Sequence, residues 1–279
     1  MNKAWITTVV ILFLWCSEGL ALFENEGISS RYLSLGGGCA ALSDEPSIVA
    51  SNPGALGFYS KKGVEISWSQ LFNLKELSSG DFYFVYPLGR IFSRSSLTAG
   101  LGFNIFGQSD YYQESILSLA FGYEIKNYLS LGTSFKYMRV SFPHPYSDLS
   151  AIGFDSGLLV KIRNRVQIGA VIKNLNRPEV IEGSDDVPRV LDLGIAVFPF
   201  DDVKIILDFV KDFQFDHQIK LGQEIMILKR LALRLGIETE PVTYGVGAGF
   251  GWENSTIDYA FLSHPSLGVS HKVSFAFGW

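Results

Sequence analysis

Few residues of this sequence have the types and spacing that catalysis or metal binding requires. The four histidines are not at metal-ligand spacing from one another, and none has a cysteine beside it; they are His144, His217, His264 and His271. No Gly-x-Ser-x-Gly nucleophile elbow occurs, and no set of serine, histidine and acid stands out. We therefore expect no catalytic residue, no metal site and no cofactor, and we predict that the protein is not an enzyme.

The glycine triplet Gly36-Gly37-Gly38 is the one motif that suggests a phosphate-binding loop. That chemistry needs a Gly-Lys-Ser/Thr sequence after the glycines, and a strand and a helix on either side, and neither is present. The better interpretation is a stretch of small residues that packs closely against another backbone. The net charge of −5 and the absence of a Lys/Arg run exclude nucleic acid as an expected partner.

The first predicted element of the chain is an export signal. A basic start, a short apolar run and small residues at Gly19 and Ala21 predict a signal peptide over residues 1–21. The alternative, an uncleaved anchor, needs roughly 20 apolar residues, and Ser17 and Glu18 interrupt the run too early. After cleavage only Cys39 remains, so no internal disulfide is expected.

From Gly63 onward the sequence alternates between apolar and small or polar residues, in about fourteen runs of about ten residues each. One run, for example, sets Leu231, Leu233 and Leu235 against Ala232 and Arg234. The chain is 47% hydrophobic, which is high for a soluble exported domain, and a membrane barrel can place alternate residues against lipid.

A soluble β-sandwich also alternates, and two features favour a barrel instead. The less apolar face is rich in glycine, as at positions 245, 247, 249 and 251, which suits a confined interior better than bulk water. Tight turns also mostly alternate with longer links, as in bacterial barrels, with Glu240-Pro241 as an exception that is short where a longer link is expected. The expected longer links are residues 142–149, 175–188, 211–216 and 263–267. The expected tight turns are Lys126-Asn127, Asn164-Arg165, Asp201-Asp202, Lys229-Arg230 and Asn254-Ser255.

The C-terminal run places Val273, Phe275, Phe277 and Trp279 on one face. A terminal aromatic residue with apolar residues at every second position resembles the signal read by the barrel-assembly machinery, although phenylalanine is the usual last residue. The expected location is the bacterial outer membrane, and the expected partners are its lipid and that machinery.

Charged residues of both signs are expected to face the interior of the barrel. Mixed signs favour a neutralising network that holds the strands and the N-terminal segment together over an ion filter, which favours one sign. The inward set is Glu65, Lys136, Asp155, Lys161, Lys173, Asp192, Lys204, Asp208, Lys220, Glu224, Arg234, Glu238, Asp258 and Lys272.

The N-terminal part of the mature chain, residues 22–62, does not alternate and resembles the opening of the PorV/PorQ family, which is related to FadL-type transporters. The resemblance lies in the stretches 35–46 and 51–56, and its motif residues are Gly36, Gly37, Gly38, Asp44, Asn52 and Pro53. The family's Asn-Pro-Ala-Gly is here Asn-Pro-Gly-Ala. The resemblance implies an all-β fold, a transmembrane antiparallel barrel of about fourteen strands over residues 63–279, with residues 22–62 as a short helical hatch in the lumen.

Two functions follow from this resemblance. The main expectation is an envelope component associated with type IX secretion, which contacts secretion subunits or cargo through surfaces such as the loop from Leu175 to Pro188. The alternative is a FadL-like transporter of hydrophobic small molecules, which needs an apolar pocket beside the hatch. Candidate lining residues for that pocket are Leu33, Leu35, Leu42, Leu56 and Phe58. A passive porin is disfavoured because the hatch would occlude it.

Overall fold

The computed structural model describes residues 22–24, 27–92, 95–163, 165–181, 183 and 187–279. The expected signal peptide, residues 1–21, lies outside the described residues.

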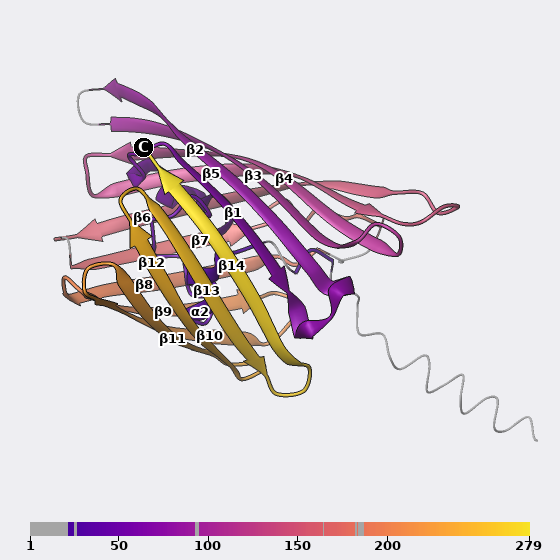
Figure 1. Cartoon of the computed structure of the whole chain (residues 1–279). Coiled ribbons are helices and arrows are strands. Elements are labelled where there is room, and N and C mark those ends of the chain that lie inside the picture. Colours follow the sequence, from indigo (N-terminus) through magenta and orange to yellow (C-terminus); the bar gives the residue numbers. More distant parts are fainter. Residues whose placement is uncertain (1–21, 25–26, 93–94, 164, 182, 184–186) are drawn as a thin grey trace, which may run out of the picture.

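The described chain forms a closed antiparallel barrel in which every strand pairs with its neighbours in sequence and the last strand pairs with the first (Figure 1). Its strands are β1 (Gly63–Gln70), β2 (Ser78–Phe92), β3 (Ser95–Gln108), β4 (Tyr112–Ile125), β5 (Leu129–Ser141), β6 (Leu149–Ile162), β7 (Val166–Lys173), β8 (Val190–Phe200), β9 (Val203–Asp212), β10 (His217–Ile227), β11 (Leu231–Glu238), β12 (Thr243–Trp252), β13 (Ser255–His264) and β14 (Gly268–Gly278). The predicted fold class is therefore confirmed.

The outer surface of the barrel is apolar because the pleat of each strand turns alternate side chains outward. In β11, Leu233 and Leu235 are exposed while Ala232 and Arg234 are buried inside. A continuous exposed apolar surface of this kind is stable against lipid. None of the helices in the described residues is long and apolar enough to cross a membrane.

The seam of the barrel joins β1 to β14, and its register pairs Gly63 with Gly278. The pairing continues past the strand ends, since the amide of Trp279 donates to the carbonyl oxygen of Lys62 at 2.9 Å and the Lys62 amide donates back at 3.1 Å. Closure satisfies the backbone groups of both terminal strands, as a membrane interior requires.

Most connections alternate in length as predicted, although the β3–β4 link, on the side of the longer loops, covers only residues 109–111. Two or three residues join β4 to β5, β6 to β7, β8 to β9, β10 to β11 and β12 to β13. Trp279 lies at this short-turn end, because the amide of Gly278 donates to the carbonyl oxygen of Asn254 in the last of these turns. The β13–β14 link, predicted to be long, covers only residues 265–267 because both strands extend further than their apolar pattern suggested.

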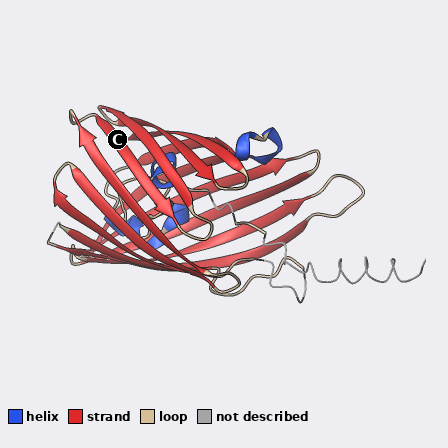
Figure 2. Cartoon of the chain, turned by 90° about the horizontal axis from the view of Figure 1, so that it is seen from below, coloured by secondary structure: helices blue, strands red, loops and turns tan. Residues whose placement is uncertain are grey.

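Residues 27–62 lie inside the barrel, and we call them the luminal segment. They form α2 (Ser30–Ser34), α3 (Ile48–Ser51) and the 3-10 helix η1 (Pro53–Phe58). Figure 2 shows these helices enclosed by the strands, while η2 (Leu71–Asn73) and η3 (Lys75–Leu77) lie at the rim between β1 and β2.

A small apolar core fills the space between the luminal segment and the wall. Leu35, Leu42 and Leu56 are fully buried there, together with Tyr83 and Ile206 of the wall. The barrel interior is therefore packed at this level, and its free volume lies above and below the segment.

Candidate functional site

The luminal segment touches the wall where the wall has glycines. Gly222, Gly236 and Gly245 are cross-strand neighbours on β10, β11 and β12. A Cβ atom on Gly245 would lie 2.9 Å from the carbonyl oxygen of Leu33, and one on Gly222 would lie 2.6 Å from that of Leu35. The row of glycines thus forms a trough that fits the backbone of α2.

A second contact holds the Asn52-Pro53 motif against β6. The side-chain nitrogen Nδ2 of Asn52 donates to the backbone carbonyl oxygens of Ala40 at 2.6 Å and Leu158 at 3.1 Å. Its Oδ1 accepts from the amide of Gly54 at 2.9 Å, which caps η1. Asn52 therefore joins two parts of the luminal segment to the wall in one side chain.

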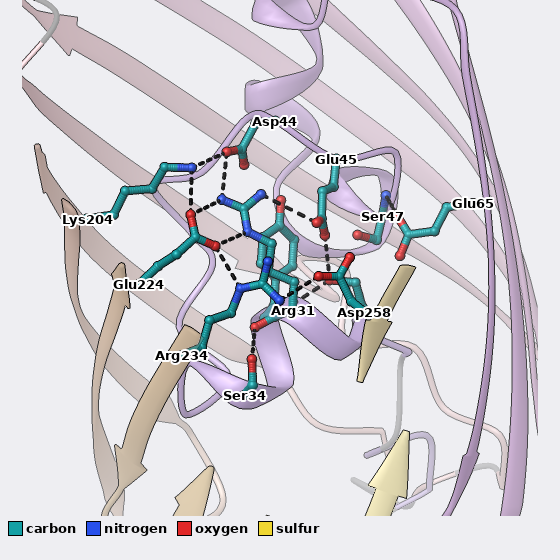
Figure 3. Close-up of polar contacts among 12 residues, drawn as sticks. Arg31, Ser34, Asp44, Glu45, Ser47, Glu65, Lys204, Glu224, Arg234 and Asp258 are labelled. Atoms are coloured by element: carbon teal, nitrogen blue, oxygen red, sulfur yellow. Dashed lines mark hydrogen bonds and ion pairs between the residues drawn. The ribbon is translucent and has the colours of Figure 1, made fainter. Parts of the chain in front are cut away.

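Arg31 is the centre of a buried ion cluster between the luminal segment and the wall (Figure 3). Its Nε donates to Glu224 at 2.7 Å, and its Nη2 donates to Asp44 at 2.8 Å. A longer contact of 3.4 Å joins Nη1 to Glu45. The Arg31 side chain is only 7% exposed and that of Glu224 only 2%, so solvent screens this pair little.

The wall completes the cluster with two more cations and one more carboxylate. Lys204 lies 2.8 Å from Asp44 and 3.0 Å from Glu224. Arg234 contacts Glu224 at 2.7 Å and Asp258 at 2.5 Å. The predicted neutralising network between strands and N-terminal segment is confirmed by these contacts. We call Arg31, Asp44, Glu45, Lys204, Glu224, Arg234 and Asp258 the Arg31 cluster.

The two carboxylates of the luminal segment titrate in opposite directions. Burial by itself raises the pKa of Asp44, but Arg31 and Lys204 outweigh it and hold that pKa well below its usual range. Burial raises the pKa of Glu45 to about 7, against the lowering effect of Arg31 and with a further rise from Asp258. The difference arises because Glu45 has the longer contact to Arg31 and faces other carboxylates.

This difference predicts that the luminal segment docks most firmly in mild acid. Glu45 has a raised pKa when docked, so its contribution is complete below its ordinary pKa of 4.5 and is lost as pH rises through about 7. Hydrogen exchange of residues 44–58, corrected for intrinsic rates, should be better protected at pH 5 than at pH 8. Glu45→Gln mimics the protonated side chain and should remove the difference; an unchanged pH dependence in that variant would contradict this assignment.

An outer vestibule lies on the long-loop side of the luminal segment. This cavity of about 610 Å³ is bounded by Leu33, Gly37 and Cys39 from the luminal segment and by the loop ends of the strands. Its apolar lining includes Phe23, Ile28, Leu33, Val190, Val210 and Phe215.

An inner cavity of about 460 Å³ lies on the short-turn side and is bounded by Arg31, Asp44 and Phe58. No described residue lines both cavities, so the luminal segment separates them.

The structure does not bring the five predicted pocket residues together. Leu33 lines the outer vestibule and Phe58 the inner cavity, whereas Leu35, Leu42 and Leu56 pack in the core between them. The small residues of the luminal segment bring its backbone close to the wall, so these three leucines fill the remaining gap and leave no cavity. Of the motif residues, Gly37 faces the vestibule and Asp44 the inner cavity.

Cys39 is buried, and burial together with Asp192 and Asp208 raises the pKa of its thiol to about 12. It therefore stays protonated and unreactive. Within the described ranges no group of three or more His, Cys, Asp or Glu side chains is arranged to hold a metal ion.

The predicted assembly signal lies on the outer face of β14 and at the seam. The ring of Trp279 stacks on Phe277 with centroids 5.5 Å apart and approaches Phe84 of β2 at 6.4 Å. Trp279→Asp should reduce the folded fraction of barrel severalfold, because it places a charge in this aromatic group at the end of the recognition signal. The measurement is the heat-modifiable mobility of membrane fractions. Trp252→Asp, an exposed tryptophan at the same rim, is the control that should assemble; equal losses would argue against a special role for Trp279.

Arg31 is the central residue that sequence reasoning missed. It lies among small and apolar residues and is the only charge between Gly27 and Ala41, which was an available signal. Asp81 was missed as well, although it binds Lys272 at 2.5 Å and Asn104 at 3.0 Å inside the barrel.

No protein-family model matches the chain, and no curated protein matches it in sequence. Its fold is similar to that of the Ralstonia pickettii toluene transporter TbuX, at 14% identity and a TM-score of 0.65, over 92% of this chain and 98% of that one. The Pseudomonas putida toluene transporter TodX is 12% identical, with a TM-score of 0.62 over 92% and 99%. A Pseudomonas aeruginosa FadL homologue is 11% identical, with a TM-score of 0.59 over 86% and 95%.

These similarities establish a FadL-like fold and correct one prediction. The assignment to the PorV/PorQ family has no family match to support it. The expected role as a secretion-associated component that acts through protein contacts is wrong, because the solved structures that the fold resembles include small-molecule transporters. The predicted location in the bacterial outer membrane is confirmed by the closed barrel and its apolar exterior.

Proposed function

We propose that this protein carries small hydrophobic molecules across the outer membrane, with residues 22–62 acting as a hatch inside the barrel of residues 63–279. The observation that carries the proposal is the outer vestibule, a cavity of about 610 Å³ that combines a group of apolar side chains with charged ones and whose floor is the luminal segment. Its volume is in the range of small-molecule sites. The similarity in fold to two toluene transporters supports the same function.

The proposed route leads from the vestibule past the luminal segment to the inner cavity. The wall behind α2 offers no opening, because the strands from β11 to β14 pair with one another without a register shift. The segment is held by side-chain contacts that can be exchanged, namely the Arg31 cluster and Asn52. A shift of the segment would join the two cavities.

The primary test is uptake of labelled toluene by a Gram-negative host that expresses the full-length protein. The initial rate should rise severalfold over a host with an empty vector, since the lipopolysaccharide leaflet slows apolar molecules. Assembly of the barrel is checked in the same cells by heat-modifiable mobility. An assembled barrel that leaves the rate unchanged would refute the proposed function.

A reversible crosslink tests the route. A Cβ atom on Gly38 would lie 3.3 Å from Cγ2 of Ile206 in β9, so cysteines at these two positions are close enough to be tested for a disulfide. Gly38→Cys with Ile206→Cys, in a Cys39→Ala background, should lose at least about tenfold in uptake when oxidised. Reduction should restore it, and each single variant is a control.

Unchanged uptake by the oxidised protein would reject the route past the hatch while leaving transport intact. It would favour exit through the wall, where residues 149–151 of β6 extend beyond β7 and beyond the hydrogen bonds that Leu175 and Asn176 make with Ile152 and Phe154.

A further inference from the structure

The outer vestibule is strongly acidic for a cavity that accepts apolar molecules. Six carboxylates and two lysines line it: Glu24, Asp192, Asp212, Asp216, Glu238 and Glu240, with Lys173 and Lys220. Lys220 is paired with Glu238 at 3.4 Å, so its charge is largely compensated. This excess of carboxylates disfavours anionic ligands and favours neutral or cationic ones.

Asp192 of β8 is a buried carboxylate to which no described residue donates a hydrogen bond at Oδ1. Its cross-strand neighbours on the inner face are Val171 and Val210, which are both buried and apolar. The residue is 93% buried, since only 7% of its surface is exposed, and its Oδ1 atom has no hydrogen-bond partner. Among the described residues none forms an ion pair with it; the nearby Asp208 repels it, and Lys220 and Lys173 attract it electrostatically.

The neighbouring carboxylate, Asp208, has a structural role at this level of the barrel. Oδ2 of Asp208 accepts from the backbone amides of Cys39 at 2.7 Å and Ala40 at 3.0 Å, which fixes the luminal segment to β9. Asp192 receives no such donor, yet it lines the vestibule beside Cys39 and Gly37. A buried carboxylate without a donor is costly unless something that binds there supplies one.

We propose that Asp192 is a recognition site for a hydrogen-bond donor, an amine or a hydroxyl group, on an otherwise apolar ligand in the outer vestibule. The inference rests on the proposed transport function and narrows its substrate class. The apolar part of the ligand would lie against Val190, Val210 and Phe215. Its donor group would reach the carboxylate of Asp192, which lies between Val171 and Val210 of the neighbouring strands. A carboxylate on the ligand would meet Asp192 and the acidic rim and be rejected.

The test uses four probes of one size: propylbenzene, 3-phenylpropan-1-ol, 3-phenylpropylamine and 3-phenylpropanoate. Binding to the full-length purified barrel is measured by equilibrium dialysis at pH 7, and uptake is measured in expressing cells. The alcohol and the amine should bind at least about tenfold more tightly than the propanoate. Asp192→Leu should weaken both by about tenfold and leave propylbenzene unchanged or bound more tightly.

Two further variants sharpen the test. Asp192→Asn keeps an acceptor oxygen without the charge, so it should retain binding of the alcohol and weaken binding of the cationic amine, which distinguishes the two donors. Asp202→Asn removes the same charge from an exposed turn at the opposite end of the barrel and should bind all four probes as the unaltered protein does.

Equal binding of the propanoate, or unaltered affinities in Asp192→Leu, would overturn the recognition site. Propylbenzene separates this failure from that of the proposed function. If propylbenzene binds and enters cells, but the protein does not distinguish the alcohol and the amine from the propanoate, only the role of Asp192 is refuted. If none of the four probes binds or enters, both the recognition site and the transport function are refuted.

Discussion

Replacing Arg31 with methionine is expected to release the luminal segment from the wall of the barrel. The substitution keeps most of the side-chain volume but removes the contacts of Arg31 with Glu224 at 2.7 and 3.0 Å. Glu224 keeps Arg234 and Lys204, but the four carboxylates of the Arg31 cluster then face only these two cations. Removing one partner of a buried ion pair typically costs about 3–5 kcal/mol. Hydrogen exchange of residues 27–58 should therefore rise by more than a hundredfold, while the strands keep their protection.

Two variants separate this effect from a general loss of stability. Arg139→Met removes an arginine from a solvent-exposed pair with Asp148 near the outer loops and should not change exchange in the luminal segment. Arg31→Lys keeps the charge but loses the planar guanidinium group and its several donors, so we expect the luminal segment to show intermediate protection from hydrogen exchange. If Arg31→Met showed the exchange of the unaltered protein, the packing against glycines would have to hold the segment without the cluster.

Release of the luminal segment in Arg31→Met should also connect the two cavities of the barrel. The outer vestibule and the inner cavity are lined by separate residues, with the luminal segment between them. Higher single-channel conductance of Arg31→Met in planar bilayers would therefore link the ion cluster to the barrier.

Much of the barrel was predictable because strand periodicity is a local property. Alternate residues such as Leu233 and Arg234 must face opposite sides of a sheet, whichever strands pair with it. The short turns were equally visible, since Asp201-Asp202 is a polar pair between apolar runs and the predicted turn Asn254-Ser255 is displaced by only one residue from the observed Glu253-Asn254. Because hairpin connections pair each strand with the next one in sequence, the order of the strands around the barrel follows from the order along the chain.

The contacts inside the lumen were not predictable in the same way. Arg31 binds Glu224, which is 193 residues away in sequence, and no local pattern pairs these two side chains. The inward direction of Glu224 follows from strand alternation, but its partner depends on where the luminal segment enters the barrel. Sequence reasoning could therefore predict a mixed-charge network without predicting its centre.

The correction of function has a physical reason as well. The Asn52-Pro53 motif that suggested a PorV/PorQ relative is a packing element: Asn52 caps η1 and binds the carbonyl oxygens of Ala40 and Leu158. Any barrel that holds an internal segment against its wall can use such an element. The motif therefore indicates architecture and does not distinguish cargo from ligand.

The glycine trough behind α2 is expected to be as sensitive as the ion cluster. A Cβ atom on Gly236 would lie 2.8 Å from the Cα atom of Leu35 and still closer to the amide nitrogen of Gly36. Both groups belong to backbone, which cannot rotate away as a flexible side chain can. The trough thus sets how closely the luminal segment can approach β11.

Gly236→Ala should therefore displace the luminal segment although it adds only one methyl group. Overpacking of a tight site commonly costs about 1–3 kcal/mol, and more is expected where backbone meets backbone. Gly251→Ala is the matched control, because a Cβ atom there would meet only the carbonyl oxygen of Arg230 at 3.8 Å. We expect exchange of residues 30–38 to rise at least tenfold in Gly236→Ala and to stay unchanged in Gly251→Ala. Equal exchange in both variants would mean that the segment docks without the trough, and that side-chain contacts alone position the hatch.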